Sequence, residues 1–122
     1  MGEGAFLGRD LALHGDVRPG VPSDWLHLSW LIETSHRVYT HWGNESLRQL
    51  LAGPGAVLWY AGRALRGALL VDVQPRGVGE ARLLAVHDDA DLTSFAGAVF
   101  PLLERRLARS QTRWLSFSNP ER

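Results

Sequence analysis

The chain has no cysteine among its 122 residues, which excludes a disulfide framework and any thiolate metal or redox site. It also has no excess charge, because 13 basic side chains balance 13 acidic ones. A nucleic-acid binder needs a basic excess to neutralise phosphates, so that class is disfavoured. No apolar run approaches the roughly 18 residues of a membrane span, and Met1-Gly2-Glu3-Gly4 lacks the basic start of a secretory signal. These absences predict a cytoplasmic protein that binds neither nucleic acid nor a membrane.

The length of the chain is enough for one independent core. A chain of 122 residues buries roughly two-thirds of its unfolded surface, so we expect 1–122 to form a single domain. Five tryptophans are many for this size. They indicate extensive apolar contacts, either within the chain or between chains.

Apolar spacing predicts the elements of the first third of the chain. Residues 9–14 alternate loosely, as a first strand does, and glycines and prolines mark 15–22 as a loop. Ser23 suits the N-cap of a helix, and apolar residues then recur at helical spacing as far as Tyr39. Trp30 falls away from that face, so either the helix is buried on two sides or Trp30 marks a contact surface.

A short helix and a hairpin follow. Asn44 suits the cap of the helix, and Gly53-Pro54-Gly55 ends it. The runs 56–60 and 65–73 read as two strands, and their short spacing predicts a hairpin. Gly67 near the start of the second strand is typical of a bulge.

The stretch 80–119 organises the rest of the chain. Residues 81–86 form a short apolar run typical of a strand, and 113–117 form another. Between them lies a long helical pattern whose apolar stripe is Leu92, Ala96, Val99, Leu103 and Leu107. A strand, a crossover helix and a second strand predict a parallel pair with a right-handed connection. The expected fold class is therefore α+β, with a mostly antiparallel twisted sheet and one parallel strand pair.

The acidic residues before the long helix favour capping over ion binding. Asp88, Asp89 and Asp91 match part of a cation-binding loop but lack its glycine and its later ligands. We therefore interpret them as a capping segment with Asp91 as N-cap. The five histidines share no helical face, and no metal site is predicted. Within the helix, Gly97 lies beneath Pro101 and predicts a close approach of the backbone to the sheet or to a ligand.

This order of elements resembles the GNAT (Gcn5-related N-acetyltransferase) fold, with its sheet splayed around a central helix and its C-terminal part missing. In that family, a strand ending in valine is followed by a phosphate loop of the form Arg/Gln-x-x-Gly-x-Gly/Ala. Counted on from Val86, the corresponding residues here are 91–96, of which only Ala96 agrees. Gly67 and Asn119 match further family positions.

The resemblance implies a site for acetyl-CoA as a possible cofactor. The cofactor-binding residues that it implies are Leu84, Val86, Thr93, Ser94, Phe95, Ala96 and Asn119. Asp91 stands at the cation position, however, and Ser94 stands at the glycine position. One carboxylate 4 Å from a phosphate charge costs about 1 kcal/mol in bulk water and several times more near a protein surface. We therefore expect a degenerate member of the family.

The resemblance also implies roles in catalysis. The family's tyrosine, the general acid for the departing thiolate, lies after the last strand seen here, whereas Tyr39 and Tyr60 lie far upstream. The candidates for a base that takes a proton from the amine are Glu80, at the head of the central strand, and His87, at its end.

Three function classes stay open. The first is a degenerate acetyltransferase-like domain that binds a small ligand or a partner. The second is an active acyl-CoA-dependent N-acyltransferase that completes its site with a second chain. The third is a purely structural or regulatory dimerisation domain. An apolar edge at Leu115 and Phe117, which later family strands would cover, predicts a homodimer through the C-terminal strand.

Overall fold

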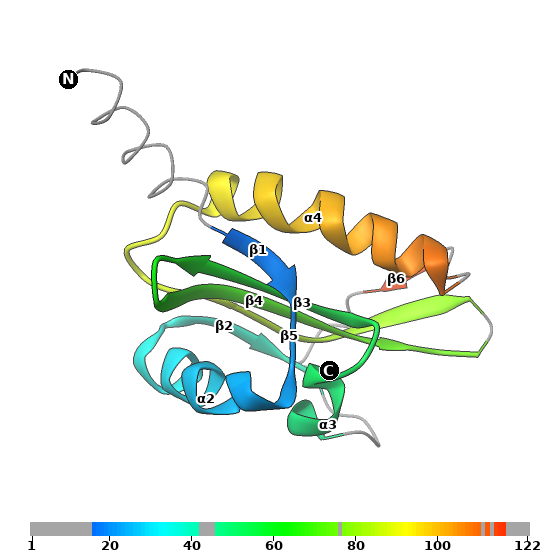
Figure 1. Cartoon of the computed structure of the whole chain (residues 1–122), viewed down its shortest axis with the longest axis horizontal. Coiled ribbons are helices and arrows are strands. Elements are labelled where there is room, and N and C mark those ends of the chain that lie inside the picture. The colour runs from blue at the N-terminus through cyan, green and yellow to red at the C-terminus, as the bar shows by residue number, and fades with distance from the viewer. Residues whose placement is uncertain (1–15, 42–45, 76, 111, 113, 117–122) are drawn as a thin grey trace.

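The computed structural model describes residues 16–41, 46–75, 77–110, 112 and 114–116. Within them, one sheet separates two layers of helices (Figure 1). Helix α4 (Leu92–Arg109) packs on one face, and α2 (Trp25–Thr34) and α3 (Leu47–Leu51) pack on the other. The α+β class expected from the sequence is confirmed.

Six strands of the described part of the chain form the sheet. They are β1 (Asp16–Pro19), β2 (Arg37–Thr40), β3 (Gly55–Ala61), β4 (Ala64–Val73), β5 (Val78–Val86) and β6 (Trp114–Ser116). Antiparallel pairs join five of these strands in the order β1-β3-β4-β5-β2. Strand β6 pairs with β5 in parallel, from Val78 opposite Trp114 to Glu80 opposite Ser116. The predicted parallel pair, with α4 as its crossover, is confirmed.

Strand β2 corrects the prediction of a helix that runs to Tyr39. Helix α2 ends at Thr34, and Ser35 is already extended, with φ −109° and ψ 146°. The next residues pair with the C-terminal half of β5, from Arg37 opposite Val86 to Thr40 opposite Leu83. The chain leaves the helix because Val38 and Tyr39 favour a strand and the free edge of β5 supplies backbone partners. Strands β2 and β6 therefore occupy successive parts of one edge of β5.

Strand β1 corrects the prediction of a loop over 15–22. It pairs with β3, from Asp16 opposite Tyr60 to Pro19 opposite Val57. Proline is tolerated there because β1 is an edge strand and Pro19 is its last residue. The predicted strand at 9–14 lies outside the described residues, as do Phe117 and Asn119. The predicted cap at Asn44 is wrong, because the N-cap of α3 is Ser46, whose hydroxyl accepts from the backbone N–H of Gln49. The predicted N-cap at Ser23 is also wrong. A 3₁₀ turn, η1 (Pro22–Asp24), precedes α2, and the N-cap of α2 is Asp24.

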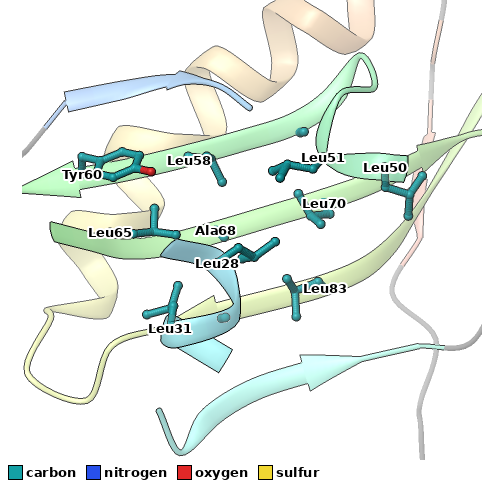
Figure 2. Close-up of a cluster of buried hydrophobic side chains, with 12 residues drawn as sticks. Leu28, Leu31, Leu50, Leu51, Leu58, Tyr60, Leu65, Ala68, Leu70 and Leu83 are labelled. Carbon is teal, nitrogen blue, oxygen red and sulfur yellow. The ribbon is translucent and has the colours of Figure 1, made fainter. Parts of the chain in front are cut away.

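The first core lies between the sheet and the pair α2 and α3. Figure 2 shows leucines from both helices directed at leucines of β3, β4 and β5. The buried residues of this core are Leu28, Leu31, Leu50, Leu51, Ala56, Leu58, Tyr60, Leu65, Ala68, Leu70, Leu83 and Ala85. Alternate residues of each strand supply it, because successive side chains of a strand point to opposite faces.

The second core lies between the sheet and α4. Its helical members are Phe95, Val99, Leu103 and Leu107. Leu92 was expected on this stripe, but its side chain is half exposed, and Phe95 takes the place next to the sheet. A Cβ at Gly67 would lie 2.4 Å from the Phe95 ring, so the glycine lets the ring lie against β4.

Two glycine predictions have different outcomes. The bulge expected near Gly67 is confirmed: Gly67 lies opposite Trp59 and Leu65 lies opposite Tyr60, which leaves Arg66 as the extra residue. The close approach expected at Gly97 is wrong, because a Cβ there would meet nothing within 4 Å. Helix α4 instead presents that glycine to solvent.

Candidate functional site

The N-terminus of α4 is capped by a carboxylate of the chain itself. Asp91 is the N-cap, as predicted, and its Oδ2 accepts hydrogen bonds of 2.8 Å from both the backbone N–H and the hydroxyl of Ser94. These two bonds hold the pKa of Asp91 below its usual range. The partial positive charge of the helix end therefore already has an anion beside it.

A second carboxylate of the same loop binds the start of β2. The backbone N–H of His36 donates to Oδ1 of Asp88 at 2.8 Å, and His36 Nδ1 lies 2.6 Å from Oδ2. The hydrogen bond to Asp88 raises the pKa of His36, and the same contact lowers the pKa of Asp88. Arg37 adds hydrogen bonds from its guanidinium to the backbone carbonyls of His87 and Ala90. The loop before α4 and the start of β2 are thus held together.

His87, one of the two base candidates, is engaged in the same region. Its Nδ1 accepts from the backbone N–H of Asp89 at 3.2 Å and lies 3.2 Å from the guanidinium of Arg66. Both neighbours are donors, whereas the Asp89 carboxylate is 3.9 Å away, so Nδ1 acts as an acceptor. The His87 ring also stacks on Trp30, with ring centres 5.8 Å apart. Trp30 remains 47% exposed, which is consistent with the contact-surface alternative.

Glu80, the other base candidate, belongs to a charged cluster on β4 and β5. Its Oε1 lies 3.2 Å from Nε2 of His41 and 3.0 Å from Nη1 of Arg82. Arg82 is buried, and its Nη2 lies 3.2 Å from Asp72 Oδ2, which also accepts from Gln74. The side chains of Glu80 and His41 are each 27% exposed, so this carboxylate is reachable from solvent.

The cluster was not predicted as a unit, although part of it could have been. Glu80 and Arg82 are two apart on a strand, a spacing that places side chains on one face. Asp72 and His41 come from other strands or their ends, so only the pairing of β5 with β4 and β2 brings them in.

The structure does not bring the two base candidates together. Glu80 and His87 lie at opposite ends of β5, and seven steps along a strand span roughly 20 Å. One substrate atom cannot contact both side chains at that separation.

The residues implied for cofactor binding are spread over several environments. Leu84 and Val86 lie on β5, where β2 pairs with the backbone edge beside them. Thr93, Ser94 and Ala96 lie in the first turns of α4, whereas Phe95 is buried with its ring 5.8 Å from that of Trp59. Their role in binding stays a prediction.

A hydrogen-bond network around the buried side chains of Tyr60 and Asp24 was missed by sequence reasoning. The Tyr60 hydroxyl donates to Asp24 Oδ1 at 2.8 Å and lies 2.9 Å from His27 Nδ1. Arg18 binds both oxygens of Asp24, at 2.9 and 2.5 Å, and the backbone N–H of Val21 donates to Oδ2 at 2.9 Å. These residues come from β1, η1, α2 and β3, so the network fixes the start of α2 against the sheet.

The pKa values in this network follow from burial and from the donors. Burial alone would raise the pKa of Asp24, but the hydrogen bonds from Arg18, Val21 and Tyr60 outweigh it and hold the pKa below its usual range. Burial, with the bond to Asp24, raises the pKa of Tyr60. Tyr60 therefore stays a neutral donor. Its side chain lies on the face of the sheet that α2 and α3 cover, not on the face that α4 covers.

An apolar groove runs between α4 and β6. Its volume is about 250 Å³, and it is lined by Phe100, Leu103, Glu104, Leu107, Ala108, Thr112 and Leu115. The hydroxyl of Thr112 is buried and has no hydrogen-bond partner among the residues that the structure describes.

Two further features were searched for in the described part of the chain. No three histidine or carboxylate side chains there are placed to hold a metal ion. No helix there is long and apolar enough to cross a membrane.

Comparison with known proteins gives similarity of fold. No protein-family model and no curated protein matches the chain. One similar structure is a point mutant of TTHA1254 from Thermus thermophilus, with TM-score 0.58 and 15% identity over 88% of this chain and 78% of that one. Another is the aminoglycoside acetyltransferase meta-AAC0020 from an uncultured soil metagenomic sample, with TM-score 0.59 and 12% identity over 85% of this chain and 76% of that one. The chain therefore has a GNAT-like fold, similar to that of an aminoglycoside acetyltransferase.

Proposed function

We propose that this chain is a degenerate acetyltransferase-like domain that binds a small ligand or a partner and transfers no acyl group on its own. The observation that carries the proposal is the carboxylate of Asp91 on the N-terminus of α4, hydrogen-bonded to Ser94. Helix N-termini bind phosphates through free N–H groups, and here the chain supplies its own anion. On this proposal the GNAT-like fold is retained, while the Asp91 carboxylate stands where the resemblance would place a phosphate.

Electrostatics support the same conclusion. Asp88, Asp89 and Asp91 stand within four residues of one another before the helix. A phosphate charge brought beside these carboxylates is repelled by them, and the repulsion is stronger near a protein surface than in bulk water. His36 offsets the charge of Asp88 when it is protonated, but Asp89 is exposed and Asp91 is bonded only to neutral donors of Ser94.

Binding of coenzyme A tests the proposal directly. Calorimetric titration and thermal shift with millimolar acetyl-CoA should show no binding by the wild type, since a ligand bound only by the native state raises the melting temperature. The double variant Asp91→Arg with Ser94→Gly should gain affinity if charge and loop shape are responsible. Glu104→Arg, an equal charge change at an exposed position of α4 about 20 Å along the helix from Asp91, is the matched control and should gain none.

Micromolar binding of acetyl-CoA by the wild type would overturn the proposal. It would favour the second candidate, an acyl-CoA-dependent N-acyltransferase that completes its site with a second chain. The observation in favour of that candidate is Glu80, a partly exposed carboxylate on the central strand that contacts His41. Acetyl transfer to amines, including an aminoglycoside because one structural neighbour acts on that class, should then fall with Glu80→Gln.

We also propose that the chain forms a homodimer through its C-terminal strand. Among the described residues, β6 pairs only with β5, and the apolar groove beside it includes Leu115. A second copy paired along this edge would cover both, because open strand edges are otherwise prone to pair with other chains. If the dimer binds no ligand, the third class, a structural or regulatory dimerisation domain, is favoured.

Light scattering at micromolar concentration tests the dimer. The wild type should give twice the chain mass, and Leu115→Lys should shift it toward the monomer. Leu26→Lys is the matched control, because Leu26 is 78% exposed on α2, across the sheet from the groove. A monomeric wild type would rule out the dimer.

A further inference from the structure

Strand β2 is four residues long, and a histidine next to each of its ends contacts a carboxylate. His36 precedes the strand and pairs with Asp88, and His41 follows it and pairs with Glu80. Both carboxylates belong to β5 or to the loop that follows it. We propose that β2 is a strap, held at each end by one of these contacts, whose closure on the edge of β5 is strengthened by protonation of His36.

Each of these two histidine–carboxylate contacts clamps one end of β2 to its neighbours. The clamp at the N-terminal end, between His36 and Asp88, is the tighter one. Oδ1 of Asp88 accepts a hydrogen bond of 2.8 Å from the backbone N–H of His36, and Oδ2 of Asp88 lies 2.6 Å from His36 Nδ1. A charged imidazole adds an ion pair to these contacts, whereas a neutral one retains at most a neutral hydrogen bond, which is roughly half as strong. The other titratable or charged groups beside this clamp are His87, which also interacts with Asp88, and Arg37, whose guanidinium donates to the carbonyls of His87 and Ala90.

The clamp at the C-terminal end combines a backbone bond with a side-chain pair. The N–H of His41 donates to the carbonyl of Arg82 at 2.9 Å, and His41 Nε2 lies 3.2 Å from Glu80. Arg82 faces the same carboxylate at 3.0 Å and also contacts Asp72. Glu80 therefore keeps Arg82 as a partner when its contact with His41 breaks, so this end of the strap can open without leaving an unpaired carboxylate.

The strap covers a defined part of the central strand. It pairs with Leu83 to Val86, while β6 pairs with Val78 to Glu80 on the same edge. If β2 opens, the backbone N–H and C=O groups of β5 over 83–86 lose their partners on that side. Such an exposed edge accepts an extended segment by strand addition. Opening of the strap is therefore a way to make this edge available.

The direction of the pH effect follows from the His36 pair. The contact with Asp88 raises the pKa of His36 in the folded state, so its contribution is fully present below the ordinary histidine pKa of about 6.5. It is lost as the pH rises through the raised value. The strap is thus closed more firmly in mildly acidic solution and opens more often in mildly alkaline solution.

Hydrogen exchange of the backbone amides tests the strap without any ligand. Protection of the amides of β2 and of its partners over 83–86 is compared at about pH 5.5 and about pH 8.5, on either side of the ordinary histidine pKa, after correction for intrinsic exchange. We expect opening to increase about threefold, which is the effect of losing one exposed ion pair. The amides of β3, which β2 does not touch, report global unfolding in the same experiment.

Variants identify the groups responsible. His36→Gln with His41→Gln keeps hydrogen-bonding side chains but cannot gain charge, so the pH dependence at β2 should disappear while the fold remains. His27→Gln is the matched control, because His27 contacts the Tyr60 hydroxyl rather than a carboxylate, and it should keep the dependence. Equal protection at both pH values, or an unchanged dependence in the double variant, would overturn the proposal. Neither result bears on acetyl-CoA binding, so this proposal stands or fails separately from the proposed function.

Discussion

At the scale of single residues, the two glycines Gly67 and Gly97 have opposite consequences for stability. Gly67→Ala would place a Cβ 2.4 Å from the ring of Phe95, which is itself buried. Overpacking of this kind costs about 1–3 kcal/mol. Gly97→Ala meets open space in the middle of a helix and should instead stabilise by roughly 0.5–1 kcal/mol. Urea unfolding midpoints measure both, and a stable Gly67→Ala protein would show that the ring can move.

The role of Gly67 could be predicted from sequence only in part. A glycine inside a strand pattern indicates a bulge or a close contact, and the structure has both. The partner could not be predicted, because Leu92 and Phe95 both fall near the apolar stripe of the helix. Phe95 is buried and Leu92 is half exposed, and the position of the helix along the sheet decides between them.

At the scale of elements, α4 was predictable because its determinants are local. Its cap, its stripe and its end lie within the helix itself. Strands β1 and β2 were not predictable, because each has four residues and exists through a partner far along the chain. Arg37 pairs with Val86, 49 residues away, and no local pattern reports such a contact. The charged cluster around Glu80 depends on the same pairings.

The cap of α4 leads to a prediction for this element. Asp91→Ala removes the acceptor of two hydrogen bonds from Ser94 and should destabilise the protein by about 1 kcal/mol. Asp91→Asn keeps a capping oxygen and should cost only a few tenths of that. Thermal or urea unfolding compares the two, and an equal loss in both variants would show that the negative charge, rather than the cap, matters.

At the scale of the whole molecule, the carboxylates set the acid limit of stability. Asp24, Asp88 and Asp91 all have folded-state pKa values below their ordinary value. The stability that each contributes is present above the unfolded pKa of about 3.9 and is lost as the pH falls through the folded value. Unfolding midpoints should therefore fall steeply below about pH 4. Asp24→Asn should be less stable at neutral pH and show a shallower fall, and an unchanged slope would exclude Asp24 as a contributor.

The sheet with helices on both faces divides the interior into two compartments that share strands but no side chains. Thermodynamic additivity should follow that division. Leu31→Val, beneath α2, and Val99→Ala, beneath α4, should have free-energy costs that sum to within about 0.5 kcal/mol in the double variant. Val99→Ala with Leu103→Val, one turn apart in the same compartment, should deviate by about 0.5 kcal/mol or more. The cost of a substitution in one compartment should therefore not depend on which side chains fill the other.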